Sequence, residues 1–309
     1  MGKLLSLIVP VFNEEEVVDI SFEKLNEAMK NIGYDYEIIY VNDGSRDNTM
    51  KSLRNLAKVN KQLKVLSFSR NFGHQLAVTA GMDIAKGDAL IIIDADLQDP
   101  PETIKELVKA WENGADIAYG KRLKREGETI FKKFTAFCYY RLLKSMSASP
   151  IPLDTGDFRL LDRKVADLFL KMREHNRFLR GMSGFMGFET VPVEYVRHSR
   201  FAGKTKYSLK KMLKLAFDGI IGFSDRPLTL ITGIGIGILI IAGLGLIALI
   251  VLAATVGVPG WLWAVDGLVI LDGIIMASLG IQGAYMNRMY DELKGRPLYI
   301  VGEQLNCEG

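Results

Sequence analysis

The chain has 309 residues, of which 49% are hydrophobic, and a formal net charge of +3 at pH 7. The length allows one large domain with an appendage. The weak positive charge excludes a strongly basic nucleic-acid-binding protein, and we therefore expect no nucleic-acid partner. The two cysteines, Cys138 and Cys307, are too few for a disulfide framework or a cysteine metal cluster, as is typical of proteins in a reducing compartment.

The first 120 residues alternate between two periodicities. Short runs rich in β-branched and aromatic residues are separated by segments with the spacing of amphipathic helices. This alternation predicts an α/β domain with a parallel or mixed sheet covered by helices on both faces. The expected strands are Leu4–Val11, Glu37–Asn42, Lys64–Ser69, Ala89–Asp94 and Asp116–Tyr119, and the expected helices span roughly residues 14–32, 48–60, 74–86 and 101–113.

Polar side chains follow three of these strands. Asn13–Glu14 comes after the first strand, Asn42–Asp43 ends the second, and Asp94–Asp96 ends the fourth. In open α/β sheets, ligands bind outside the carboxyl ends of the strands. The three polar clusters are therefore expected to converge on one crevice.

Asp94 and Asp96 stand one residue apart directly after a buried strand, so both carboxylates can approach one cation. Mg²⁺ and Mn²⁺ commonly bind one or two carboxylates together with substrate phosphates. The pair therefore predicts a Mg²⁺ or Mn²⁺ site that would neutralise a diphosphate leaving group. The alternative for so short a motif is a solvated loop, but Pro100 and Pro101 at the start of the next helix support the strand context.

Residues 121–205 have a less regular pattern. A basic stretch at residues 121–125 leads to a helical run and then to Asp154–Arg159, before another helical run begins near Arg163. We interpret this part as belonging to the same domain and as forming the acceptor side of its site, where the group that receives the transferred moiety would bind.

An amphipathic helix is predicted at Tyr207–Phe223. Its apolar residues recur on one stripe, while Lys210, Lys211 and Lys214 lie on the other face. A basic amphipathic helix next to an apolar span is typical of the membrane interface. The alternative is an ordinary surface helix packed on the core.

Two apolar runs, Leu228–Val256 and about Val265–Met286, are each long enough to cross a bilayer, which takes about 20 residues. A turn at Gly257–Gly260 separates them, and Trp261 and Trp263 fit the aromatic belt of a membrane interface. The turn has no Lys or Arg, whereas basic residues flank both ends of the pair. By the positive-inside rule, both ends of this transmembrane hairpin are expected in the cytoplasm.

The second apolar run contains Asp266 and Asp272. A carboxylate inside a membrane is either a functional group or a structural contact between helices or subunits. Gly233 and Gly237 in the first run form a small-residue face suited to close helix packing. These features predict a homo-oligomer.

The expected organisation therefore has four parts. The chain should be a multi-pass protein of the inner or plasma membrane with its catalytic domain in the cytoplasm. The parts are a catalytic domain at 1–206, an interface helix at 207–226, two transmembrane helices at 227–287 and a cytoplasmic tail at 288–309.

Seven segments carry a family resemblance: Ile8–Glu14, Val41–Ser45, Ser69–His74, Asp94–Pro100, Asn176–Gly181, Gly203–Ser208 and Arg288–Val301. Together they resemble family 2 glycosyltransferases of the GT-A fold, in the branch of dolichyl-phosphate mannose synthases and bacterial polyisoprenyl-phosphate glycosyltransferases. The resemblance covers essentially the whole chain and implies a Rossmann-like catalytic domain. The same branch suggests a tetramer.

The resemblance implies a nucleotide-sugar site. Asp43 would accept the ring N–H of the base, and Asp94 and Asp96 would hold the diphosphate and the metal, with Gln98 as a further ligand. Asp43 also has a simpler interpretation as a turn residue, since Asp-Gly favours turns. The remaining residues of the implied nucleotide-sugar pocket are Pro10, Phe12, Glu14 and Ala95.

An acceptor site is implied as well. Asp157 would be the catalytic base or orienting group, and the acceptor phosphate would meet Arg122, Arg200 and Lys206, since arginine suits bidentate phosphate contacts. Asp157 could instead cap a turn or pair with Arg159.

Other basic residues leave choices open. Arg122 is one of four basic residues in its stretch, and Arg177 and Arg180 could serve equally or pair internally. His74 is expected near the nucleotide in a structural role.

The implied reaction is the inverting transfer of a hexose to polyprenyl phosphate, such as undecaprenyl phosphate. The expected donor is UDP-glucose, which would transfer glucose. GDP-mannose, a UDP-N-acetylhexosamine and UDP-4-amino-arabinose are alternative donors. A processive polysaccharide synthase would need a Gln-x-x-Arg-Trp motif and more membrane spans than the two predicted here. A nucleotidyltransferase would need a glycine-rich phosphate loop near the N-terminus. The sequence therefore disfavours both classes. A lipid-binding membrane scaffold with an inactive domain is the non-enzymatic alternative.

Overall fold

The structure is a computed structural model that describes residues 2–123, 155–175, 177–196, 244, 259 and 261–307. Arg200, Lys206, the interface helix at 207–226 and, apart from residue 244, the first apolar run lie outside the described residues. The chain divides into two compact units. The first contains Met1–Lys144, Ser149–Ser208 and Pro297–Gly309, and the second contains Ser145–Ala148 and Leu209–Arg296.

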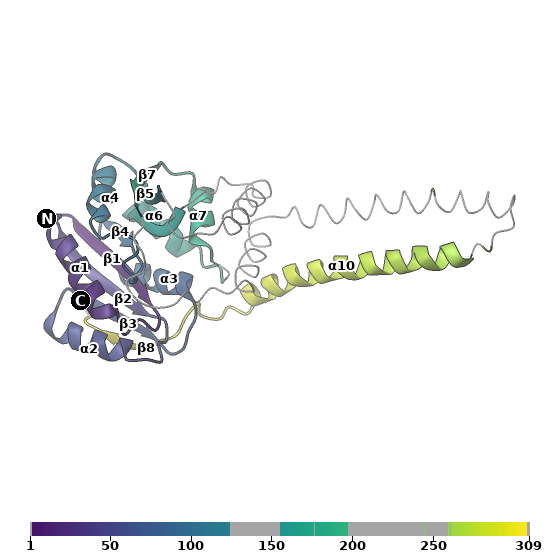
Figure 1. The fold of residues 1–309 in the computed structure, drawn as a ribbon, viewed down its shortest axis with the longest axis horizontal. Coiled ribbons are helices and arrows are strands. Elements are labelled where there is room, and N and C mark those ends of the chain that lie inside the picture. Colours follow the sequence, from purple (N-terminus) through teal and green to yellow (C-terminus); the bar gives the residue numbers. More distant parts are fainter. Residues whose placement is uncertain are drawn as a thin grey trace. The chain divides into compact units, whose positions relative to one another are not determined.

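A mixed sheet forms the centre of the first unit (Figure 1). Among the described residues the strand order is β7-β5-β6-β4-β1-β2-β3-β8. The neighbours from β4 to β3 run parallel, while β6 runs antiparallel to β4 and β8 antiparallel to β3. The strands are β1 (Leu4–Val11), β2 (Asp35–Asn42), β3 (Leu63–Phe68), β4 (Ala89–Ile92), β5 (Ile117–Arg122), β6 (Thr155–Asp162), β7 (Thr190–Tyr195) and β8 (Val301–Leu305).

The predicted strand–helix alternation is confirmed, with each of the nine expected elements within a few residues of its predicted bounds. The predicted parallel or mixed sheet is mixed, because β6 and β8 enter it in the opposite direction. The helices of the first unit are α1 (Val18–Lys30), α2 (Thr49–Val59), α3 (His74–Ile84), α4 (Thr103–Glu112), α6 (Arg163–Lys171) and α7 (Leu179–Met186).

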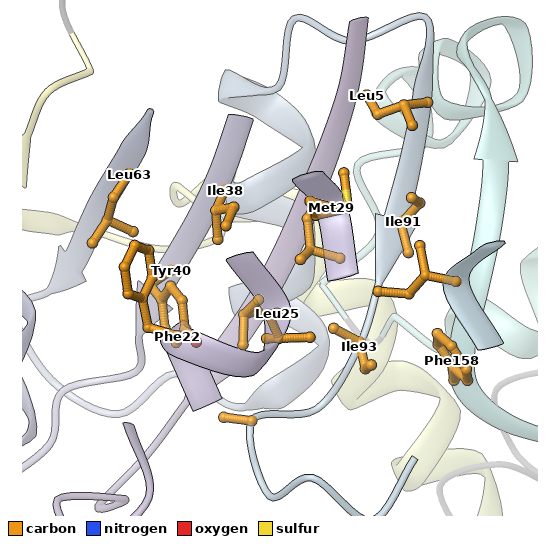
Figure 2. Packing of buried hydrophobic residues seen from close by; sticks show 14 of the residues in the cluster. Leu5, Phe22, Leu25, Met29, Ile38, Tyr40, Leu63, Ile91, Ile93 and Phe158 are labelled. Carbon is orange, nitrogen blue, oxygen red and sulfur yellow. The ribbon is translucent and has the colours of Figure 1, made fainter. Parts of the chain in front are cut away.

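The core lies between the sheet and the helices that cover it. Alternate residues of a strand face opposite sides, so Leu5 and Leu7 of β1 join one cluster with Phe22 and Leu25 of α1 (Figure 2). Ile8 points to the other side, against α3, where a Cβ added to Gly81 would clash with its side chain. The missing side chain lets α3 pack close to the sheet, which fixes the helix whose first residue is His74.

The C-terminal segment is part of the first unit. Val65 of β3 pairs with Leu305 of β8, and Arg54 forms a two-pronged ion pair with Glu303 at 2.9 and 2.6 Å. The expected tail therefore ends as an edge strand of the sheet. The five-residue sequence of β8, with a glycine in it, has too little pattern to predict a strand.

The second unit contains α10 (Trp261–Leu293), which includes the second predicted apolar run. Within the part of the chain that the structure describes, none of the helices is both long and apolar enough to span a bilayer. The transmembrane hairpin, and the roles expected of Asp266 and Asp272, stay predictions.

A buried acidic residue ties the amino ends of the strands together. The Glu37 carboxylate accepts hydrogen bonds from the Ser6 hydroxyl at 2.5 Å and the Lys86 N–H at 2.6 Å, and pairs with the Lys64 ammonium at 2.6 Å. Burial raises the pKa of Glu37, but Lys64 and the two hydrogen bonds outweigh burial and lower it from its ordinary value of 4.5.

Replacing Glu37 by glutamine should destabilise the domain. Glu37→Gln leaves the mostly buried Lys64 charge without its partner, so we expect the free energy of unfolding to fall by about 3 kcal/mol at pH 7. Because the pKa of Glu37 is lowered on folding, its stabilisation exists above the unfolded value and is lost as pH falls through the folded value. The Tm difference between Glu37→Gln and wild type should therefore be largest at pH 7, smaller at pH 4 and smaller again as the pH falls through the folded pKa of Glu37.

Glu106→Gln is the matched control. Glu106 pairs with Lys109 at 2.9 Å on an exposed helix face, and such pairs contribute little. Its Tm should stay within about 1 °C of wild type at both pH values. Equal Tm shifts for the two variants would contradict a special role of the buried pair.

Candidate active site

The loops after β1 and β2 are joined by hydrogen bonds. The Asn13 N–H donates to Ser45 Oγ at 2.9 Å, and the Arg46 N–H donates to Asn13 Oδ1 at 2.9 Å. Asn13 has a φ of 54°, in the left-handed region that asparagine tolerates better than most residues. Two of the three predicted polar clusters therefore meet at the carboxyl end of the sheet.

Asp43 organises the loop between β3 and α3. Its buried carboxylate accepts hydrogen bonds from Asn71 Nδ2 at 2.7 Å, from the Phe72 N–H at 2.7 Å and from the Gly73 N–H at 2.9 Å. Burial raises the pKa of Asp43, although these N–H groups oppose the shift. Asp43 is thus more than a turn residue, and its contact with a base stays a prediction.

Gly44 lets this loop approach. Its φ of +67° lies in the left-handed region, and an added Cβ would come within 2.6 Å of the Asn71 backbone nitrogen. Only glycine meets both demands without strain. Asp43 can therefore reach the N–H groups of the neighbouring loop.

The loop after β4 holds the predicted metal ligands. The Gln98 N–H donates to Asp96 Oδ1 at 3.1 Å, around Leu97, whose φ of 55° is unusual for a leucine. Burial, and then the charges of Asp157 and Asp96, raise the pKa of Asp94 to about 6, although His74 opposes the rise. Negative charge is therefore crowded around Asp94.

The described residues include no group of three or more His, Cys, Asp or Glu side chains placed to hold a metal ion. A site of two carboxylates completed by substrate phosphates needs no such group. Asp94, Asp96 and Gln98 stay the predicted ligands.

The antiparallel pairing of β4 and β6 brings together Asp94, on the predicted donor side, and Asp157, on the predicted acceptor side. Ile92 pairs with Arg159, so continuing the same register by two residues sets Asp94 opposite Asp157. The chain between these two strands spans more than 60 residues. Their proximity depends on the register of the sheet.

Asp157 is held by a guanidinium group. Arg180 donates from Nε to Oδ1 at 2.9 Å and from Nη2 to Oδ2 at 3.2 Å, and Gln75 adds a contact at 3.4 Å. Burial would raise the pKa of Asp157, but Arg180 and His74 hold it well below its usual range. So acidic a group is a weak base, which favours an orienting role.

The arginines whose roles were open are now distinguished. Arg180, rather than Arg159, is the ion-pair partner of Asp157. Arg177 donates to the carbonyls of Phe169 and Met172, where it holds the segment after α6. Arg177 is therefore a structural residue.

His74 stands between the two sides of the site. Its Nε2 lies 3.3 Å from Asp157 Oδ2 and 3.7 Å from Asp94 Oδ1. Burial would lower its pKa, but the two carboxylates raise it to about 9, so an imidazolium faces both. The sequence prediction of a structural histidine near the nucleotide missed this bridging position, because it depends on strands distant in the sequence.

Arg122 is fixed by a buried network. Its Nε donates to the Tyr195 hydroxyl at 3.1 Å, its Nη2 lies 3.7 Å from Asp99 Oδ1, and the Tyr195 hydroxyl donates to Asp99. A Cβ added to Gly156 would lie 2.5 Å from Arg122 Nη2. The sequence predicts no role for Asp99 or Tyr195. Asp99 lies within the Asp94–Pro100 segment without a role of its own, and Tyr195 belongs to none of the recognised segments.

Of the other basic residues in this stretch, Lys121 pairs with Glu194 at 2.9 Å, and Lys124 and Arg125 lie outside the described residues. Within this stretch, Arg122 is the residue whose guanidinium lies against Gly156, next to Asp157. Among the predicted pocket residues, Pro10 and Ala95 are buried and Phe12 and Glu14 half-buried. Their contact with a nucleotide is a prediction.

Residues 6–169 match the family model of Glycosyl transferase family 2. The chain belongs to this family. An uncharacterized glycosyltransferase of Bacillus subtilis is 46% identical over 308 residues, which are 98% of this chain and 94% of the relative. A prophage bactoprenol glucosyl transferase homolog of Escherichia coli is 40% identical over 302 residues, 96% of this chain and 98% of the relative.

A solved mannosyltransferase from Pyrobaculum calidifontis, in complex with GDP-Man and Mn²⁺, is similar with a TM-score of 0.45 and 14% identity. That alignment covers 96% of this chain and 89% of the mannosyltransferase. The resemblance to family 2 glycosyltransferases seen in the sequence is confirmed by the family match, and the enzyme is a glycosyltransferase.

The Asp157–Arg180 contact gives a test within this family 2 enzyme. Arg180→Lys keeps the positive charge but loses the planar pair of N–H donors. We expect the rate of sugar transfer to fall about tenfold or more, because Asp157 is no longer held in one orientation. The initial rate of nucleoside diphosphate release from the donor measures the effect.

Arg54→Lys makes the same change in the exposed Arg54–Glu303 pair, away from the site, and should leave the rate unchanged. If Arg180→Lys turned over at the wild-type rate, the paired contact would have no role in catalysis.

Proposed function

We propose that this enzyme transfers glucose from UDP-glucose, with inversion, to polyprenyl phosphate, with undecaprenyl phosphate as its acceptor. One observation carries the proposal: the nearly full-length similarity, at 40% identity, to a protein named as a bactoprenol glucosyl transferase homolog. Bactoprenol is a polyprenol, so the acceptor class follows from that name. The product would be a polyprenyl-phosphate sugar.

The chemistry of the acceptor agrees with the state of Asp157. A phosphate monoester is already anionic near neutral pH, since its second pKa is about 6. It needs little help from a base, and Asp157, paired with Arg180, has a pKa too low to provide much. Asp157 would therefore orient and balance charge, while Arg122, Arg200 and Lys206 would bind the acceptor phosphate.

The donor side has the chemistry of a divalent cation site. Asp94, Asp96 and Gln98 offer oxygen ligands of the kind that Mg²⁺ and Mn²⁺ prefer. Burial, and to a lesser degree the charges of Asp157, Asp96 and Asp99, raise the pKa of Asp94 to about 6, and a bound cation would offset the repulsion among these carboxylates. A cation bound there would neutralise the departing diphosphate.

The step is an in-line displacement. An oxygen of the acceptor phosphate forms a bond to the anomeric carbon as the bond from that carbon to the UDP oxygen breaks, which inverts the configuration. Catalysis would come mainly from positioning and charge neutralisation. Asp94 and Asp157, which face each other across the β4–β6 register, would serve the leaving and attacking sides.

The location of the acceptor supports a membrane anchor. An interface helix at 207–226 and two transmembrane helices at 227–287 would hold the catalytic domain at the cytoplasmic face of the inner or plasma membrane. Hydropathy and the distribution of basic residues support this arrangement. A homo-oligomer, with a tetramer as the expected form, belongs to the same proposal.

A donor and acceptor panel tests the proposed reaction. Membranes containing the protein are incubated with undecaprenyl phosphate and either UDP-glucose, GDP-mannose or another UDP-sugar. We expect UDP-glucose to give a lipid heavier by one hexose, no product after EDTA, and recovery with Mn²⁺ or Mg²⁺. A product with GDP-mannose alone would replace the donor, and no donor turnover would favour an inactive lipid-binding scaffold.

Removing the charge of either predicted carboxylate ligand, Asp94 or Asp96, should strongly lower the rate of sugar transfer. We expect Asp94→Asn and Asp96→Asn to lower the rate at least about 100-fold, because each removes charge that would hold the cation at the leaving group. Mass spectrometry of the glycolipid measures the product. Asp167→Asn is the control, since Asp167 lies on α6 in an exposed pair with Arg163 at 3.6 Å, and a wild-type rate for Asp94→Asn would refute the metal site.

A further inference from the structure

Residues 69–73, which join β3 to α3, form what we call the donor loop. This loop supplies all three hydrogen-bond donors that hold the Asp43 carboxylate: the Asn71 amide and the N–H groups of Phe72 and Gly73. The position of this loop and the orientation of the Asp43 carboxylate are therefore coupled. Contacts with the strand before the donor loop and with the helix after it can set that position.

Tyr299, in the segment before β8, contacts the elements at both ends of the donor loop. Its ring stacks on Phe68, the last residue of β3, with centroids 5.0 Å apart and an angle of 21°. Its hydroxyl donates to Asp83 Oδ2 of α3 at 2.6 Å. One side chain thus spans the strand that precedes the loop and the helix that follows it.

The stack continues into the loop itself. Phe68 meets Phe72 edge to face, with centroids 5.6 Å apart, and the Phe72 N–H donates to Asp43 at 2.7 Å. Two aromatic contacts therefore lead from Tyr299 to the group that holds Asp43. Edge-to-face and offset-stacked rings have preferred geometries. The position of the Tyr299 ring therefore constrains the position of Phe72 through Phe68.

Tyr299 is itself well anchored. The Ser69 N–H donates to the Ile300 carbonyl at 3.0 Å, and β8 begins at the next residue. Asp83 is held from the other side by Arg173, whose Nη1 and Nη2 lie 2.9 and 2.6 Å from its oxygens. The partner groups on both sides of Tyr299 are thus fixed independently of the nucleotide.

We propose that Tyr299 is a positioning residue for the nucleotide: by stacking on Phe68 and binding Asp83, it sets the donor loop and, through Phe72, the Asp43 carboxylate. The inference rests on the proposed function, in which Asp43 binds the base. It assigns the C-terminal segment a part in donor binding. If the C-terminal segment had a purely structural role, substitutions at Tyr299 would change the stability of the protein but not its affinity for the nucleotide.

Equilibrium binding of UDP with Mn²⁺ to the full-length protein tests the inference. Tyr299→Leu removes the stacked ring and the hydroxyl but keeps apolar volume, and it should raise the Kd for UDP about tenfold. Tyr299→Phe keeps the ring and should stay within about threefold of wild type. In transfer assays, Tyr299→Leu should raise the KM for the donor while kcat at saturating donor changes less than threefold.

Glu303→Gln separates positioning from general docking of the strand. It breaks the exposed Arg54–Glu303 pair on β8 but leaves the rings in place, so its Kd for UDP should equal that of wild type. A Tyr299→Leu protein that binds UDP like wild type would overturn the inference. An equal loss in Glu303→Gln would also overturn it, since docking alone would then explain the effect.

Hydrogen exchange keeps the inference testable if Tyr299→Leu is poorly stable. At low temperature, where the variants are folded, and relative to the amides of β1, the amides of Phe72 and Gly73 should exchange faster in Tyr299→Leu than in Tyr299→Phe, because only Tyr299→Leu has lost the ring that stacks on Phe68. Equal relative exchange in the two variants would overturn the inference. Failure of the proposed function has a different signature: wild-type protein itself would bind neither UDP nor its sugar conjugate.

Discussion

Buried negative charge at the carboxyl ends of the strands is the constraint on which the site depends. A carboxylate removed from water must be paired or hydrogen-bonded. Asp43 has the N–H groups of the donor loop, Asp99 has Tyr195 with Arg122 beside it, and Asp157 has Arg180. Asp94 has a longer contact, 3.7 Å, with His74 Nε2, and burial and its acidic neighbours raise its pKa to about 6. The proposed cation would therefore lie at a carboxylate whose charged partner is more distant than the one that pairs with Asp157.

The mixed sheet explains why donor and acceptor chemistry can share one site. Parallel strands bring the ends of β1, β2 and β4 to one edge, as expected for a ligand crevice. The antiparallel strand β6 then inserts beside β4 and delivers Asp157 to the same edge from the opposite direction. His74, at the start of α3, lies between the two carboxylates. The proposed in-line reaction would require groups on opposite faces of the sugar, and the opposite directions of β4 and β6 place Asp94 and Asp157 where they could serve the two faces.

The C-terminal segment joins parts that are remote along the chain. β8 extends the sheet next to β3, and Tyr299 contacts both β3 and α3, on either side of the donor loop. A segment that follows α10 in sequence is thus part of the catalytic unit. If Tyr299 has the proposed positioning role, removing the end of the chain would alter the predicted nucleotide side of the site as well as the edge of the sheet.

Local pattern in the sequence determined the first five strands, the four helices between them and the clustering of Asn13, Asp43 and Asp94 at strand ends, because periodicity and turn residues act over a few positions. Short motifs likewise identified the family. Only the tertiary structure decided that Arg180 pairs with Asp157, that Tyr195 and Asp99 hold Arg122, and that β8 completes the sheet. Each of these contacts joins residues whose separation along the chain leaves no local signal, and the register of the sheet and the packing of its loops bring them together.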